Sequence, residues 1–178
     1  MFDVEAHFRE IVGRGFDTTP VKGKKKSTPK ESVLNKLDAD MKEKKVVHES
    51  FNLVNCFSAH PDPNRLSMMR WKNGTISKRR AVYLLVLSGK VIKVGQSINY
   101  FRRMNDYRYR IGYSCKNLTP ELNKMIREAG EDILIFVRYY DDDEYREDEW
   151  GEKVLHSACL SSAENKWQEV YSDTLKFA

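Results

Sequence analysis

The segment from residue 81 to residue 94 constrains the fold more than any other part of the chain. Residues 81–87 form a short run of β-branched, aromatic and other apolar residues, and residues 90–94 continue with valines and an isoleucine among lysines. Residues of these types favour strands. Ser88 and Gly89, which separate the two runs, are typical of a tight turn. The pattern therefore predicts a β-hairpin.

Two helices are predicted after the hairpin. The first covers residues 97–108, with Ser97 at its start and apolar side chains that return at helical spacing. The second has Thr119 as its N-cap and Pro120 as its first helical residue, and Gly130 marks its end.

The apolar run at residues 133–140 predicts a third strand, and a last helix is expected from Glu149 to Ser157. The chain is therefore expected to be an α+β protein with a small three-stranded antiparallel sheet flanked by helices. Residues 79–178 would form this core, and residues 1–78 a basic, mostly helical N-terminal extension or arm.

Charge is distributed unevenly along the chain. The net charge of +5 and the sequence pI of about 9.0 favour a polyanionic partner. Lysines gather in residues 22–45, arginines in residues 102–110, and acidic residues in 141–152. This separation predicts a basic binding surface beside an acidic feature that could hold a metal. A solvated surface with a mobile basic tail is the alternative.

Cysteine count and hydropathy exclude several classes of protein. The three cysteines are odd in number and lack CxxC spacing, which argues against a disulfide framework or a structural zinc site. No stretch approaches the roughly 18 apolar residues that a membrane span needs. The first ten residues carry acids where a signal peptide would be basic. We expect a cytoplasmic protein without a membrane partner.

The block from Gly95 to Tyr107 carries a resemblance to a known family. It reads G-x-S-x-N-x-x-x-R-x-x-x-Y, with Arg103 eight residues after the glycine. The tripeptides at residues 81–83 and 93–95 stand where the GIY-YIG nuclease superfamily has its GIY and YIG motifs, although Ala81 and Lys93 depart from them. Residues 81–168 thus resemble that superfamily, in particular its restriction-type and phage-type members.

The resemblance implies a metal-dependent DNA endonuclease and assigns roles to four residues. Tyr83 would be the base near which water is activated. Lys93 would lower the pKa of this phenol, orient water or contact phosphate. Arg103 would stabilise the phosphate as its charge rises, and Tyr107, one helical turn further, would bond to water or phosphate.

The expected cofactor is Mg²⁺ or Mn²⁺. Hard Mg²⁺ ions need only one or two carboxylates together with phosphate and water. The resemblance assigns the metal to Glu152 on the last helix, with Glu149 as the alternative. Asn165 or Gln168 would fill the position at which the family has an asparagine near the end of the domain.

The expected partner is double-stranded DNA, and a homodimer is a reasonable expectation because cutting both strands requires two active sites. One alternative is a catalytically inactive GIY-YIG-like DNA-binding module, and another is a basic protein whose residues 22–45 dock on an acidic protein. The residues expected to contact DNA are Lys24, Lys25, Lys26, Arg102, Arg108, Arg110, Asn165 and Gln168.

Overall fold

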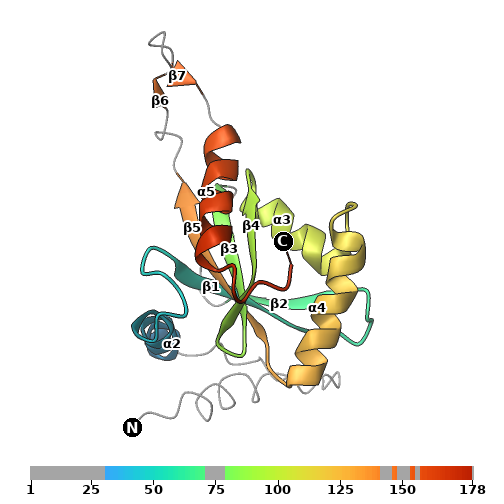
Figure 1. The fold of residues 1–178 in the computed structure, drawn as a ribbon. Helices are drawn as coiled ribbons and strands as arrows, with labels where there is room; N and C mark the ends of the chain where they lie inside the picture. Colours follow the sequence, from blue (N-terminus) through green and yellow to red (C-terminus); the bar gives the residue numbers. More distant parts are fainter. Residues whose placement is uncertain (1–30, 71–78, 141–145, 148–152, 155–156, 178) are drawn as a thin grey trace.

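The centre of the fold is a five-stranded antiparallel sheet with the strand order β2-β1-β5-β3-β4 (Figure 1). The computed structural model describes residues 31–70, 79–140, 146–147, 153–154 and 157–177. The strands of the sheet are β1 (Asn52–Ala59), β2 (Leu66–Arg70), β3 (Arg80–Leu87), β4 (Lys90–Ser97) and β5 (Ile133–Tyr140). The helices are α2 (Glu31–Glu43), α3 (Tyr100–Tyr109), α4 (Cys115–Ala129) and α5 (Ser157–Val170).

The predicted hairpin and third strand are confirmed as β3, β4 and β5. Ser88 and Gly89 have φ values of 50° and 69°, so both turn residues are left-handed, as a tight hairpin turn requires. Strand β3 pairs with β4 on one side and with β5 on the other. The α+β class is confirmed as well.

The predicted number of three strands is wrong, because β1 and β2 extend the sheet. Both lie in the segment predicted to be mostly helical, and β1 pairs with β5. Strand β1 has few exposed positions, so it lacks the alternation of apolar and polar residues by which a half-exposed strand is recognised. The boundary drawn between residues 78 and 79 therefore crosses one hydrogen-bonded sheet.

The sheet is covered on both faces. Leu84 and Val86 of β3 belong to a core cluster with residues of α2 and α5, whereas Tyr83 and Leu85 belong to a second cluster with residues of α3 and α4. Successive side chains of a strand point to opposite faces, so β3 must be apolar throughout. This accounts for the uninterrupted run at residues 81–87.

Helix α3 begins later than predicted. Strand β4 continues to Ser97, and Asn99 is the N-cap, with its side-chain oxygen accepting a hydrogen bond of 3.0 Å from the backbone of Arg102. Ser97 instead accepts from the backbone N–H of Asn99 at 3.1 Å. Asparagine is as good an N-cap as serine, so residue type alone did not decide the boundary.

Helix α4 begins earlier than predicted, at Cys115. Thr119 is not its N-cap, because the Thr119 hydroxyl donates to the Tyr107 carbonyl at 2.9 Å. Pro120 lies inside the helix and cannot donate to the carbonyl of Lys116. The side chain of Arg110 donates to that carbonyl instead, at 2.5 Å. The predicted end at Gly130 is confirmed, with a left-handed φ of 67°.

The last helix is also displaced from its predicted position. Lys153–Val154 is a short strand, β7, paired with β6 (Arg146–Glu147), and the last helix is α5. Leu160 and Trp167 bury one side of α5 against the sheet. Residues 165–168, which were predicted to form a closing segment after the last helix, thus lie in a helix that packs on the sheet. In the described part of the chain, none of the helices has the length and apolar character needed to cross a bilayer.

Candidate active site

Tyr83 and Gly95 face each other across strands β3 and β4. A Cβ atom built on Gly95 would lie 2.4 Å from both Cζ and Oη of Tyr83. Real Cβ atoms do not approach other heavy atoms so closely. The glycine is therefore required because the tyrosine ring lies directly over its backbone.

The Tyr83 hydroxyl meets two residues of α3. It shares a hydrogen bond of 2.7 Å with the Tyr107 hydroxyl, and Nε of Arg103 donates to it at 3.2 Å. Arg103 and Tyr107 are four residues apart, so they lie on the same face of the helix. The guanidinium also lies 4.9 Å from the centre of the Tyr107 ring. The structure thus brings these three predicted residues together.

Burial controls the ionisation of the two phenols. Both tyrosines are fully buried, and burial raises the pKa of Tyr83 and of Tyr107, while the positive charge of Arg103 acts in the opposite direction. Both hydroxyls therefore remain protonated at neutral pH, held against a permanently charged guanidinium.

The start of α4 fixes the other end of the guanidinium. Nη1 of Arg103 donates to the Ser114 hydroxyl at 2.9 Å and lies 3.9 Å from the Cys115 sulfur. Ser114 was not among the predicted site residues. Its contact joins two helices that meet only in the folded protein, and no sequence pattern marks it.

Lys93 lies on the same sheet face as Tyr83, because it pairs with Leu85 two residues along β3. Its side chain is half-buried. Burial lowers the pKa of Lys93 and Arg103 adds to this effect, while the negative charge of Glu164 opposes it. Arg103 is the cation that donates a hydrogen bond to the Tyr83 hydroxyl, and its charge is the largest influence that lowers the pKa of this phenol.

Glu164 on α5 is the carboxylate that interacts with these charges. Burial raises its pKa, whereas hydrogen bonds from Gln96 and the charges of Lys93 and Arg103 lower it. The Gln96 side chain also donates to the Ser161 hydroxyl at 2.8 Å, so two residues of α5 are tied to β4. β4 is an edge strand, and α5 brings its carboxylate to that edge.

Glu164 was not among the residues predicted from the sequence. The predicted ligands Glu152 and Glu149 lie outside the described residues, as do Lys24, Lys25 and Lys26. A usable signal was present: Glu164 stands between Leu160 and Trp167, which bury α5 at helical spacing. Extending the last helix to Trp167 would have placed Glu164 on it.

Glu164 is a carboxylate at this site that could hold a hard divalent cation. Within the described ranges, no three His, Cys, Asp or Glu side chains gather as a metal cluster. Mg²⁺ does not require such a cluster, because one or two carboxylates with phosphate and water are enough. Glu164 satisfies that requirement.

The predicted DNA-contact residues on α3 differ in their surroundings. Arg102 is exposed. Arg108 lies 4.9 Å from the Tyr109 ring centre and donates to Asn105 at 3.4 Å. Arg110 is used within the protein, where it donates to Lys116 and to Asn64 at 2.5 and 2.7 Å.

Asn165 and Gln168 both lie within α5. Asn165 is exposed and Gln168 is half-buried. They were predicted to follow the last helix, in a closing segment. Their position inside a helix corrects that interpretation of residues 165–168.

Neither a scan of protein-family models nor a search of curated proteins finds a match for this sequence. Among solved structures, the chain is similar to a mutant of EndoII from bacteriophage T4, with a TM-score of 0.53 and 13% identity. The similarity covers 73% of this chain and 94% of that one. At this identity it shows a shared fold and nothing more.

A weaker similarity links the chain to restriction endonuclease HPY188I in complex with product DNA. The TM-score is 0.43 and the identity 19%, over 76% of this chain and 78% of that one. This TM-score is too low to establish a shared fold. The fold that this chain shares is therefore that of T4 EndoII.

Proposed function

We propose that this chain is a metal-dependent DNA endonuclease of the GIY-YIG kind. The observation that carries the proposal is the contact of Tyr83, Arg103 and Tyr107 over the backbone of Gly95, with Lys93 and Glu164 interacting electrostatically with the same arginine. The fold shared with bacteriophage T4 EndoII supports it.

Arg103 is the proposed ligand of the scissile phosphate. Its guanidinium is half-buried and held by hydrogen bonds to Tyr83 and Ser114, so it needs little reorganisation when charge develops. A planar, permanently charged fork also matches the oxygens of a phosphate. Tyr107, whose hydroxyl bonds to that of Tyr83, would hold the arrangement together.

Tyr83 is the proposed base that takes a proton from the attacking water. Because burial raises its pKa, the proton must leave with the help of the Arg103 charge. Lys93 is the second candidate, since its pKa is lowered by burial. If Tyr83 is the base, Tyr83→Phe should lose more activity than Lys93→Met; the reverse order would assign the base to Lys93.

Glu164 is the proposed residue that holds Mg²⁺ or Mn²⁺. The ion would supply Lewis acidity to the phosphate and to the leaving oxygen. Gln96 fixes the carboxylate by hydrogen bonds from its side chain and its backbone. The proposed substrate is double-stranded DNA, and cleavage of both strands by a homodimer belongs to the same proposal.

An inactive DNA-binding module is the second candidate function. It is favoured by the complete burial of Tyr83, together with the raised pKa of its phenol. A base must reach water within hydrogen-bond distance, which a buried hydroxyl can do only through movement of its neighbours. The two candidates differ in one observable, cleavage.

Nicking of supercoiled DNA with Mg²⁺ or with EDTA tests the proposal. Arg103→Ala and Glu164→Gln should each reduce the rate by roughly 100-fold or more, as loss of a transition-state contact does. Glu169→Gln is the matched control, because it makes the same change as Glu164→Gln at an exposed carboxylate of the same helix. Metal-independent cutting, or full activity of Glu164→Gln, would contradict the assigned chemistry, and folded protein that binds DNA without cutting would identify the inactive module.

A further inference from the structure

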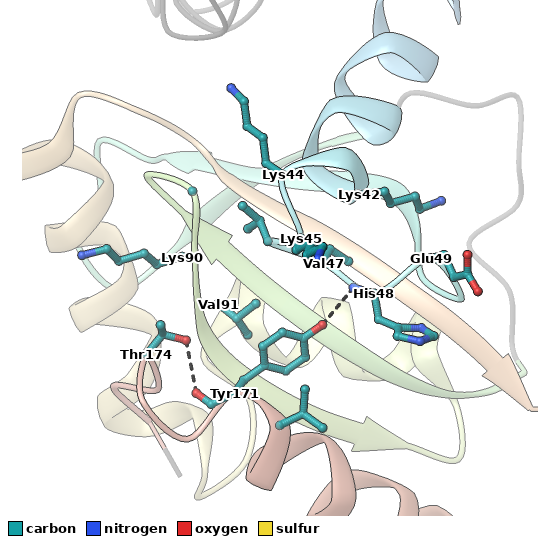
Figure 2. A pocket seen from close by; sticks show the side chains of 13 residues that line it. Lys42, Lys44, Lys45, Val47, His48, Glu49, Lys90, Val91, Tyr171 and Thr174 are labelled. Atoms are coloured by element: carbon teal, nitrogen blue, oxygen red, sulfur yellow. Dashed lines mark hydrogen bonds between the residues drawn. The ribbon is translucent and has the colours of Figure 1, made fainter.

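A basic cavity lies at the opposite end of β4 from Gly95. Its volume is about 610 Å³, and it is formed by the end of α2 and the loop after it, the β3–β4 turn and the end of α5 (Figure 2). Its lining includes four lysines, Lys42, Lys44, Lys45 and Lys90, and one acid, Glu49. The cavity is thus a concave surface of positive charge.

Two of the four lysines, Lys42 and Lys44, each form an ion pair with an acidic residue of α2, whereas Lys45 and Lys90 form none with the described residues. The Lys42 ammonium lies 2.6 Å from the Asp38 carboxylate, and the Lys44 ammonium lies 3.4 Å from that of Asp40. Within the part of the chain that the structure describes, Lys45 and Lys90 form no ion pair, and both are exposed. Their charges are therefore available to an anion.

Lys45 stands at a position that favours glycine. Helix α2 ends at Glu43, and Lys45 has a left-handed φ of 57° while the Val46 N–H donates to the Met41 carbonyl at 3.0 Å. This is the helix end at which glycine is usual, because a side chain there costs about 1 kcal/mol. The backbone conformation does not favour a lysine at this position, which is consistent with a role for its charge.

The floor of the cavity is apolar and held in place. Val47 and Val91 are buried, and the Tyr171 ring lies beside Val91 in Figure 2. The Tyr171 hydroxyl accepts a hydrogen bond of 2.9 Å from the His48 backbone, which ties the end of α5 to the loop after α2. The lysines thus stand around a fixed depression.

Two independent paths give the separation of this cavity from the candidate active site. Lys90 precedes Lys93 by three residues on β4, which corresponds to about 10 Å. Tyr171 follows Glu164 by seven residues and continues the α5 hydrogen bonds, which again corresponds to about 10 Å, on the same side of the helix. β4 is the last strand of the five-stranded sheet, and Lys176 and Phe177 pair with its outer edge at Ile92 and Lys93. A polymer that passes both places would therefore run over this short segment.

We propose that the cavity binds a backbone phosphate of the DNA strand that is cut, one or two nucleotides from the scissile phosphate. The rise of about 3.4 Å per nucleotide is measured along the duplex axis, and neighbouring phosphates of one strand lie farther apart than this, so a separation of about 10 Å spans fewer than three nucleotides. Lysine ammonium groups bind phosphate as point charges and require no particular base. This inference rests on the proposed nuclease function and adds a substrate-positioning site to it.

Lys45→Gly and Lys90→Gln test the inference, with Lys124→Gln as the matched control. Lys124 is a lysine of α4, on the far face of the sheet, and its side chain is 72% exposed. Lys45→Gly removes the charge and also the left-handed strain, so the variant should fold at least as well as the wild type. Urea unfolding checks this.

DNA affinity is measured against salt concentration in EDTA, where no cutting occurs. Each cavity variant should lower the slope of log K against log salt by about 1 and weaken binding roughly fivefold to tenfold near 0.1 M salt. In Mg²⁺ the KM of cutting should rise with kcat unchanged, because the cavity positions the strand without touching the reacting atoms. Lys124→Gln should change neither quantity.

The outcomes separate the two proposals. If the wild type cuts DNA but both cavity variants keep its salt slope and KM, the phosphate site is refuted and the nuclease stands. If folded wild-type protein neither binds nor cuts DNA, both proposals fail together.

Discussion

Gly95→Ala is the most direct perturbation of the candidate active site. The new Cβ would lie 2.4 Å from Cζ and Oη of Tyr83 and 2.7 Å from Cε2. Carbon atoms in contact prefer about 3.5–4.0 Å, so the ring would have to retreat by about 1 Å. Gly95 does not have a positive φ, so alanine adds a steric conflict without backbone strain.

The retreat of the ring sets the expected magnitude. Tyr83 is bonded to Tyr107 at 2.7 Å and to Arg103 at 3.2 Å, and a shift of about 1 Å takes at least one of these bonds beyond hydrogen-bonding distance. Overpacking a buried site costs about 1–3 kcal/mol of unfolding free energy. Misplacement of a catalytic group by about 1 Å costs about 100-fold in rate.

Urea unfolding and the nicking assay measure these two quantities. In a Tyr83→Ala background the conflict disappears, so the cost of Gly95→Ala should fall below about 0.5 kcal/mol. Gly130→Ala is the control: its φ is 67° and no atom lies within 4 Å of the added Cβ. It should cost about 1 kcal/mol in both backgrounds. An equal cost of Gly95→Ala in both backgrounds, or wild-type activity of the single variant, would refute the reasoning.

Three further predictions concern ionisation, preorganisation and metal. Asp132 is 4% exposed and accepts from Ser58 at 2.7 Å, and burial raises the pKa of this carboxyl to about 6, above the unfolded value of 3.8. A raised pKa stabilises the fold at low pH and loses that stability as pH rises through about 6. Asp132→Asn should therefore remove a loss of about 2 kcal/mol between pH 4 and pH 7.5, measured by urea unfolding; an unchanged pH profile would contradict this. Ser114→Ala frees one nitrogen of Arg103 and should slow nicking roughly tenfold without loss of fold, so full activity would show that the contact is unnecessary. Mn²⁺ should raise the melting temperature of the wild type but not that of Glu164→Gln, and an equal rise in both would place the metal elsewhere.

Local features of the chain were predicted correctly where they depend on neighbours in sequence. The hairpin follows from β-branched residues around Ser88 and Gly89, whose left-handed conformations close the turn. Arg103 and Tyr107 share a face because helical spacing puts residues four apart together. Gly130 ends α4 because glycine adopts the left-handed conformation at low cost.

Burial on both faces hid β1 from the sequence analysis. A strand covered on one face alternates between apolar and polar residues, whereas β1 shows no such period and reads ambiguously. Its identity as a strand comes from pairing with β5, about eighty residues further along the chain.

The sequence by itself determined the hairpin and the Arg103–Tyr107 helix face, because each depends on interactions within a few residues. Only the tertiary structure placed the carboxylate of Glu164 beside these residues. Glu164 reaches Gln96, Lys93 and Arg103 because Leu160 and Trp167 seat α5 against the sheet beside the edge strand β4. That placement is made by the packing of segments far apart in the chain, where local patterns carry no information about which side chains meet.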